Sequence, residues 1–182
     1  MLFQMLEILY PRRCAVCDEI EVTGKGICPL CKDKVHVAGE PACKKCGKPF
    51  VDERKEFCTD CGKKHHVYTQ GKAVFVYEGG IRNSMYRFKY GNKREYAEFY
   101  ANAAVEKYGV WLNKIKAEVL IPIPMYSRKK RLRGYNQAEV FARELRRKAR
   151  ILVDEHLVRR VRNTIPQKEL NESQRQKNLK KI

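Results

Sequence analysis

All eight cysteines of this sequence lie between residues 14 and 61, where they form four C-x-x-C pairs. Gaps of 10, 11 and 11 residues separate the pairs CAVC, CPLC, CKKC and CTDC. A structural Zn²⁺ takes four thiolates at about 2.3 Å, and one C-x-x-C turn supplies two of them. Four evenly spaced pairs therefore predict two structural zinc ions. The predicted ligands are Cys14, Cys17, Cys28, Cys31, Cys43, Cys46, Cys58 and Cys61.

Disulfides and redox chemistry are the two alternatives for these cysteines. C-x-x-C partners lie too close in sequence to close a useful loop, and a reducing compartment disfavours disulfides. A redox role normally involves one C-x-x-C at a helix start rather than four in series. His36, His65 and His66 are metal ligands by type, but the cysteines already fill two sites.

The grouping of the cysteine pairs stays open between two arrangements. Consecutive pairs would build two zinc ribbons in tandem, whereas alternate pairs would build a cross-brace. Glycine follows Cys46 and Cys61 and suits the left-handed turn of a zinc knuckle, so CKKCGKPF…CTDCGKK has the pattern of a complete ribbon. This favours consecutive pairing. A module over residues 1–64 buries little core, so the metal would supply most of its folding energy.

Positive charge is concentrated after residue 64. Residues 1–64 hold 12 Lys and Arg against 10 Asp and Glu, whereas residues 65–182 hold 27 against 11. Such charge favours phosphate-bearing partners, either nucleic acid or small phosphorylated substrates. The longest apolar run, residues 119–125, is far shorter than the roughly 20 residues that cross a bilayer. No basic leader precedes an apolar stretch, so we expect a cytoplasmic protein without a membrane span.

The periodicity of apolar residues predicts the elements around these groups. Leu2, Leu6, Leu9 and Tyr10 would share one face of a short N-terminal helix. Residues 72–77 form a strand candidate, and residues 81–116 indicate helices interrupted near Gly91 and Asn92. Tyrosines in this stretch are interpreted as packing residues rather than as base-stacking platforms. They are Tyr86, Tyr90, Tyr96, Tyr100 and Tyr108.

A strand, a basic turn and a helix follow. Residues 118–125 form a strand candidate that is continuously apolar after Glu118, as in a buried parallel sheet. A helix would come next, and residues 151–153 start another strand, whereas residues 158–182 are polar and basic without periodicity. The helix would bury Ala138, Phe141, Ala142 and Leu145. This alternation predicts an α/β fold for residues 65–182.

The turn after residues 118–125 carries a dense cluster of positive charge. It contains Arg128, Lys129, Lys130, Arg131 and Arg133, with Gly134 and a helix start behind it. Backbone N–H groups, a helix dipole and guanidinium groups together suit a phosphate, and ligands of open α/β sheets bind where strands end. A solvated charge run is the alternative.

Four blocks of the sequence resemble the ComF family of competence-associated, phosphoribosyltransferase-like proteins. They are PRRCAVC…ICPLC…CKKCGKPF…CTDC, AVFVYEGGIRNSMYRFKYGNKRE, VLIPIPMYSRKKRLRGYNQAEVFAREL and LVRRVRNTIPQKELNESQRQKNLKKI. The third and fourth blocks are the most specific. The resemblance implies a double zinc ribbon followed by a type I phosphoribosyltransferase-like parallel sheet.

The resemblance also implies a ligand and its binding residues. Type I phosphoribosyltransferases bind phosphoribosyl pyrophosphate with Mg²⁺. The pyrophosphate loop and the following helix start would contribute Arg128, Lys129, Arg131, Arg133, Gly134, Asn136 and Gln137. A mobile hood would contribute Arg162, Thr164, Gln167 and Arg175. Such a hood must open and close over the substrate, which agrees with its polar composition.

One departure from the family separates two functional hypotheses. The family continues to a strand with two acids and a T-T-G loop, which residues 65–182 lack. We therefore expect an incomplete sheet, weak ligand binding and no transferase activity from this chain alone, and we assign no catalytic residue. The first hypothesis is a ComF-like protein of DNA uptake or nucleotide metabolism. The alternative is a non-catalytic zinc-ribbon adaptor for single-stranded DNA or uptake-machinery proteins.

Overall fold

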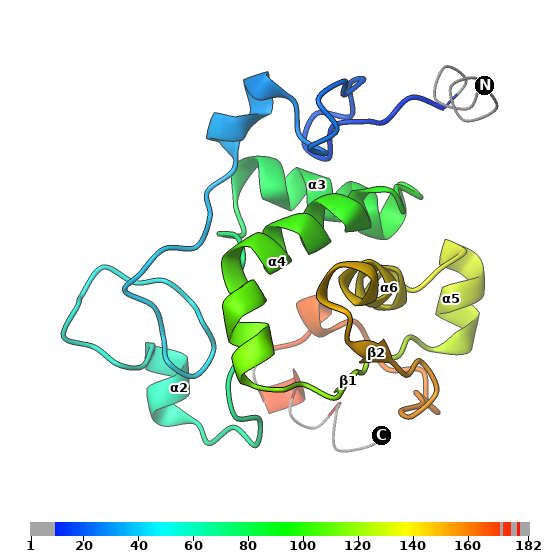
Figure 1. The fold of residues 1–182 in the computed structure, drawn as a ribbon. Coiled ribbons are helices and arrows are strands. Elements are labelled where there is room, and N and C mark those ends of the chain that lie inside the picture. The colour runs from blue at the N-terminus through cyan, green and yellow to red at the C-terminus, as the bar shows by residue number, and fades with distance from the viewer. Residues whose placement is uncertain (1–9, 172, 176–177, 179–182) are drawn as a thin grey trace. The chain divides into compact units, whose positions relative to one another are not determined.

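The computed structural model describes residues 10–171, 173–175 and 178 (Figure 1). The helix expected at the N-terminus lies outside the described residues except for Tyr10, which is exposed. The chain divides into two compact units, Met1–Lys107 and Tyr108–Ile182. The first unit holds both cysteine quartets together with helices that follow the compositional boundary expected at residue 64.

The two halves of the cysteine module begin with the same hydrogen-bonded turn, repeated at an offset of 29 residues. In the first turn, Cys14 N donates to Glu19 O at 2.8 Å, and in the second, Cys43 N donates to Lys48 O at 2.9 Å. Isolated β-bridges keep the same offset, because Arg13 pairs with Ile20 and Ala42 pairs with Pro49. The module is therefore an internal repeat of two similar ribbons.

Each ribbon closes with a short helix that starts at a cysteine. The 3-10 helix η1, Pro29–Lys34, follows Cys28 at its N-cap, and helix α2, Thr59–Lys63, follows Cys58 in the same way. Pro29 stands at the start of η1, where an N–H would have no partner within the helix. These turns bring the second C-x-x-C pair of each ribbon back toward the first pair.

Two longer helices complete the first unit. They are α3, Gly79–Tyr90, and α4, Tyr96–Lys114, which continues past the boundary between the units. The gap between them confirms the interruption expected near Gly91 and Asn92, where Asn92 adopts a φ of 54°. The strand expected over residues 72–77 is reduced to an isolated bridge between Val37 and Phe75.

The core of the first unit is rich in aromatic side chains. Phe75 stacks on Phe99 with ring centroids 5.4 Å apart, and Phe99 also meets Tyr100 edge-on at 5.3 Å. The hydroxyls of Ser84 and Tyr100 lie 2.6 Å apart, so the buried Tyr100 hydroxyl has a hydrogen-bond partner. These contacts join α3 and α4 to the chain that leads into them.

The tyrosines of the two helices divide between core and surface. Tyr96 and Tyr100 on α4 are buried, which confirms the packing role expected for them. Tyr86 and Tyr90 on α3 are exposed, so the same expectation is wrong for them. They lie on the side of α3 opposite its buried residues, Ile81, Ser84 and Phe88.

The second unit contains a small parallel sheet with helices in the crossover. Strand β1, Val119–Leu120, pairs with β2, Leu152–Val153, in parallel. Helices α5, Ser127–Arg133, and α6, Gln137–Ala149, connect them, and the 3-10 helix η2, Gln167–Glu169, follows β2. The order β–α–α–β agrees with the expected helix–strand alternation.

The apolar run over residues 118–125 is not buried on both faces, contrary to the expectation. Pro122 is buried, but Val119, Ile121 and Ile123 are 38%, 42% and 76% exposed. Leu152, which pairs with Val119 in the sheet, is 67% exposed. Side chains alternate along a strand, so one face of this sheet is covered and the other is open.

Candidate functional site

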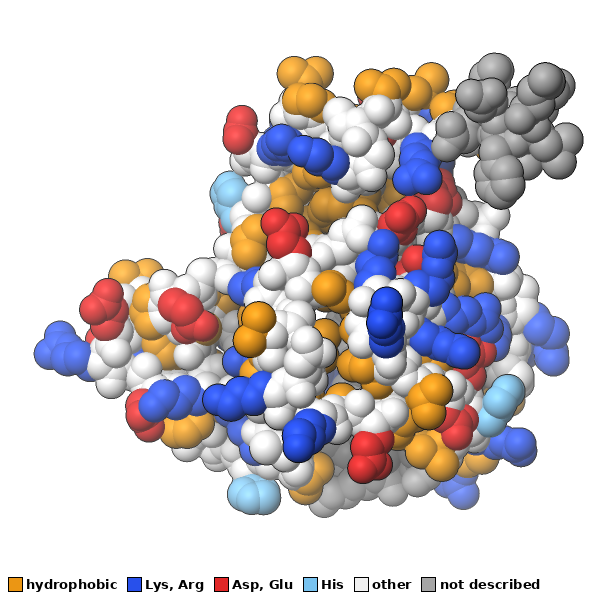
Figure 2. All heavy atoms as spheres, viewed as in Figure 1, with side chains coloured by type: hydrophobic (Ala, Val, Ile, Leu, Met, Phe, Trp, Pro, Cys, Tyr) orange, Lys and Arg blue, Asp and Glu red, His pale blue; other side chains and the backbone are white. Residues whose placement is uncertain are grey.

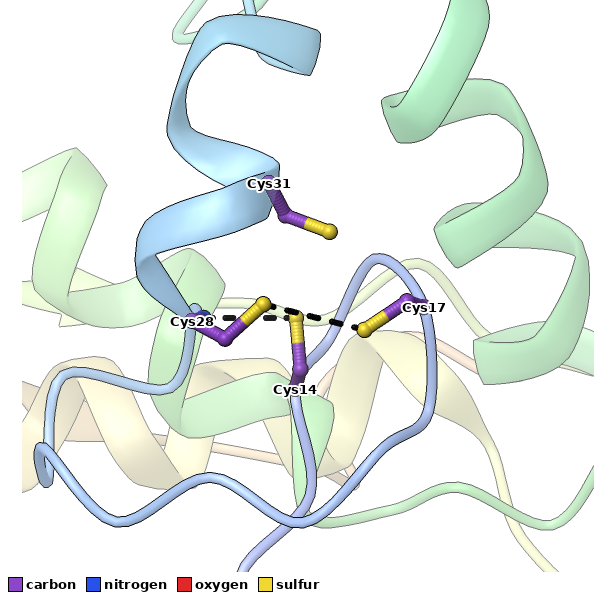
Figure 3. A group of neighbouring side chains, drawn as sticks. All are labelled: Cys14, Cys17, Cys28 and Cys31. Carbon is purple, nitrogen blue, oxygen red and sulfur yellow. Dashed lines mark hydrogen bonds between the residues drawn. The ribbon is translucent and has the colours of Figure 1, made fainter.

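The eight cysteines form two separate clusters, each built from consecutive C-x-x-C pairs. All eight are free thiols, and the sulfurs within a cluster lie within 4.8 Å of one another. In the first cluster, shown in Figure 3, Cys17 Sγ lies 3.8 Å from Cys28 Sγ, and in the second, Cys46 Sγ lies 3.7 Å from Cys58 Sγ. A tetrahedron with Zn–S bonds of about 2.3 Å has edges of roughly 3.8 Å. Both clusters therefore fit zinc, in tandem ribbons rather than a cross-brace.

The electrostatics of the clusters also suit a cation. Burial would raise the pKa of Cys14, but backbone N–H groups, led by that of Cys17, outweigh it and lower the pKa to about 7. Backbone N–H groups likewise overcome burial at Cys43 and lower its pKa to about 6. Burial and the neighbouring sulfurs raise the pKa of Cys31 to about 12. Four thiolates so close together need a compensating positive charge, which zinc supplies.

The first ribbon is fastened to helices α3 and α4 by residues in and beside its first knuckle. Asp18 Oδ1 accepts a hydrogen bond of 2.7 Å from the Tyr96 hydroxyl and lies 2.8 Å from Lys93 Nζ. Arg87 donates to the carbonyl of Val16 at 2.7 Å. Asp18 adopts a φ of 71°, a left-handed conformation that aspartate tolerates better than most residues. The first cysteine cluster is therefore part of the helical core.

The second ribbon packs instead on the chain that follows it. Gly47 stands where Asp18 stands in the first ribbon, with a φ of 74°. A Cβ atom at Gly47 would lie 2.7 Å from the backbone nitrogen of Ala73, so only glycine fits. Gln70 also donates to the carbonyl of Lys44 at 3.0 Å. The second cysteine cluster therefore contacts residues 70–73 directly, and α4 only through this segment, where Lys107 donates to the Ala73 carbonyl at 3.2 Å.

The basic segment of the second unit is helix α5 rather than a turn, which corrects the sequence expectation. The segment has strong helix formers between Ser127 and Gly134, and Gly134 ends the helix in a left-handed conformation with a φ of 83°. Figure 2 shows Lys and Arg side chains gathered over α5 and α6. Asn136 caps α6, as expected at the helix start, by accepting from Ala138 N at 3.0 Å.

The residues of α5 differ in how their charges are used. Arg128 and Arg131 are exposed, whereas Lys130 pairs with Glu139 at 2.6 Å. Arg133 donates to Gln137 at 2.5 Å. Some cationic side chains of α5 therefore face solvent, and others bind residues at the start of α6.

Donors from α5 and from the stretch before η2 meet at Thr164. Lys129 Nζ donates to the Thr164 carbonyl at 2.8 Å, and Arg160 donates to the Thr164 hydroxyl. Arg175 donates to the carbonyl of Gln167 at 2.9 Å, and Arg162 is exposed. The Nε atom of Arg160 and the Nε2 atom of Gln167 are buried with no hydrogen-bond partner. The structure thus joins Lys129 of the predicted loop with Thr164 of the predicted hood.

Arg160 is the residue of the cluster around Thr164 that the sequence did not predict. It lies in the basic run RRVRN, where neighbouring arginines are indistinguishable by type and only Arg162 matched the expected motif. Its contact with Thr164 depends on the bend of the chain over these residues, and periodicity carries no signal for such a bend.

Comparisons with known proteins concern the cysteine module. Residues 5–62 match the model of the double zinc ribbon domain. Competence protein F of Haemophilus influenzae is 38% identical over 63 residues, which cover 35% of this chain and 28% of that relative. No solved structure matches the chain significantly. None of the described helices is long and apolar enough to cross a membrane. The chain therefore carries a double zinc ribbon with two four-cysteine sites and resembles a competence protein over about a third of its length.

Proposed function

We propose that this protein is a ComF-like member of the phosphoribosyltransferase family, acting in DNA uptake or nucleotide metabolism. Its ribbons hold two structural zinc ions, and its second unit binds phosphoribosyl pyrophosphate or a related phosphate. The double ribbon and the similarity to a protein named for competence support the zinc-binding and ComF-like part of the proposal. The hydrogen-bond donors around Thr164 support the phosphate-binding part.

The observation that carries the phosphate proposal is a surplus of buried donors. Lys129 and Arg160 both donate to Thr164, although a carbonyl and a hydroxyl are weak acceptors for two cations. The donors left unpaired on Arg160 and Gln167 each cost about 1–3 kcal/mol when buried. Phosphate oxygens would satisfy them through charge-assisted hydrogen bonds.

Mg²⁺ would reach this site only with the ligand. The groups around Thr164 are nitrogen donors, which repel a cation, whereas Mg²⁺ prefers oxygen ligands. The phosphates of phosphoribosyl pyrophosphate would supply those oxygens.

Calorimetric titration of the zinc-loaded protein with pyrophosphate and with phosphoribosyl pyrophosphate tests the proposal. Lys129→Met and Arg160→Met should each weaken binding about tenfold or more, because each removes a charged hydrogen bond. Arg146→Met, an exposed arginine of α6, is the matched control and should bind like the parent. Equal binding by all four proteins would show that α5 is only a solvated charge run.

The alternative function, a nucleic-acid adaptor, has support of its own. The second unit carries 20 Lys and Arg against 7 Asp and Glu, and α3 exposes aromatic residues beside positive charge. Partners would be single-stranded DNA and proteins of the uptake machinery. DNA binding should fall steeply with salt, whereas phosphoribosyl pyrophosphate bound by buried donors should survive moderate salt.

A further inference from the structure

Helix α3 has an outward face that the core does not use. Tyr86 and Tyr90 are 65% and 52% exposed, with ring centroids 5.1 Å apart and an interplanar angle of 49°. They stand four residues apart, so both rings project from the same side of the helix. The opposite side buries Ile81, Ser84 and Phe88. The two tyrosines therefore present ring surface to solvent while other residues hold the helix in place.

Positive charge lies on the same face. Arg82 and Lys89 stand four residues before Tyr86 and three residues after it, and Arg82 is exposed. Helix α3 contains three Lys or Arg residues and no Asp or Glu. The third, Arg87, points elsewhere, because it donates to the carbonyl of Val16. We call Arg82, Tyr86, Lys89 and Tyr90 the α3 stripe.

We propose that the α3 stripe is a binding surface for single-stranded nucleic acid, with bases stacked on Tyr86 and Tyr90 and phosphates neutralised by Arg82 and Lys89. Aromatic rings that alternate with cations are the usual means of binding unpaired strands, since every base has a face to stack. A duplex keeps its base faces inside the helix and offers only phosphates to these tyrosines. The stripe therefore favours unpaired strands.

This inference rests on the adaptor function and locates it in the first unit. The zinc-loaded full chain is titrated with a fluorescently labelled oligothymidine of about 20 nucleotides, longer than one typical site, and with an abasic oligomer of the same length and charge. The parent should bind the oligothymidine more tightly, because only that strand can stack. Replacing either tyrosine with alanine should weaken oligothymidine binding about tenfold and leave the abasic strand unchanged.

Variants of matched chemistry separate stacking from folding. Tyr86→Phe and Tyr90→Phe keep the rings and should bind like the parent. Tyr77→Ala removes a tyrosine that is 63% exposed and lies outside the stripe, and it should also bind like the parent. Arg82→Ala should weaken both strands and lower the salt dependence by about one released counterion. Zinc content and far-ultraviolet circular dichroism of each variant show whether it is folded.

Three results would overturn the inference. Failure of the parent to bind any strand at low salt rejects the adaptor function and the stripe together. Oligothymidine binding that is unchanged by Tyr86→Ala and Tyr90→Ala rejects the stripe and leaves nucleic-acid binding to other basic surfaces. An equal loss for both strands would mean that the tyrosines act on the fold rather than on bases.

Discussion

At the scale of single residues, one position decides how each ribbon is attached. Both ribbons need a left-handed residue after the first C-x-x-C pair, and they fill it with Asp18 and Gly47. Aspartate is somewhat strained there but gains Lys93 and Tyr96 as partners. Burial opposes ionisation of Asp18, yet Lys93 and Tyr96 outweigh it and lower its pKa. Glycine at residue 47 leaves room for the backbone of Ala73.

Replacing Asp18 tests this division of roles. Asp18→Gly should keep the knuckle and both zinc ions, since glycine favours the left-handed turn. It should still lower the free energy of unfolding by about 1–3 kcal/mol, because the Tyr96 hydroxyl loses its buried acceptor. Asp18→Asn keeps an acceptor and should cost less. Urea denaturation and zinc analysis measure both effects, and an unchanged stability in Asp18→Gly would contradict the attachment.

Residue spacing predicted the zinc sites but not their surroundings. C-x-x-C turns are local, so sequence distance alone brings each pair of sulfurs together. The partners of Asp18 lie far along the chain, at Lys93 and Tyr96, where periodicity shows a helix but not which ribbon it meets. The hydrogen-bond donors proposed to bind an anion were predicted only in part for the same reason. Lys129 and Arg160 lie far apart in sequence and come together at Thr164 only in the folded chain.

At the scale of elements, helix α6 is tied to the chain after β2 by one ion pair. Arg143 Nε and Nη2 donate to the two carboxylate oxygens of Glu155 at 2.5 and 2.6 Å. The hydrogen bonds from Arg143 lower the pKa of Glu155 against the effect of burial. The pair fixes the end of the crossover that brings β2 beside β1.

The ion pair makes part of the stability depend on pH. A carboxyl whose pKa is lowered by folding stabilises the protein above its unfolded pKa, about 4.3 for glutamate, and loses this contribution as pH falls through the folded value. Glu155→Gln should therefore lower stability by up to about 1 kcal/mol at neutral pH, since Arg143 is largely exposed. The deficit should shrink as pH falls below the unfolded pKa and vanish only below the folded pKa, so it should be smaller at about pH 3 than at neutral pH. Thermal unfolding at both pH values measures it, and a deficit independent of pH would argue against this contact.

The elements also show why sequence patterns succeed unevenly. The break between α3 and α4 was predictable because Gly91 and Asn92 interrupt a long periodic stretch. The helical form of α5 was signalled by Ser127 and Gly134 at its ends, but clustered charge obscured that signal. The strand expected over residues 118–125 is longer than the observed strand, Val119–Leu120, because the expectation used only apolar content. Pro122 and Pro124 have no backbone N–H to donate to a neighbouring strand.

At the scale of the whole molecule, the two zinc sites have different tasks. The knuckle of the first cluster also makes hydrogen bonds to α3 and α4. The second cluster instead contacts the segment that follows it, residues 70–73. Loss of the first metal should therefore loosen the helices of the first unit. Loss of the second should leave them packed, because the contacts that fasten them to the first knuckle do not pass through the second ribbon.

Metal analysis of two cysteine variants tests this asymmetry. The purified parent should hold two zinc ions per chain, and Cys14→Ser and Cys43→Ser should each hold one, because a four-thiolate site that loses a ligand binds zinc far more weakly. Near-ultraviolet circular dichroism should fall strongly in Cys14→Ser, as Tyr96 and Tyr100 lose their packing, and only slightly in Cys43→Ser. Similar spectra for the two variants would show that the ribbons are equivalent.

The open face of the small sheet has a consequence for how this protein behaves at high concentration. Val119, Ile121, Ile123 and Leu152 place branched apolar side chains in water on this face. Such a surface attracts apolar dyes and favours self-association, whereas the strong positive charge of the second unit keeps molecules apart at low salt. Colloidal stability should therefore fall as salt is added. Ile123→Thr, which keeps the branch at Cβ but replaces the ethyl group with a hydroxyl, should restore it.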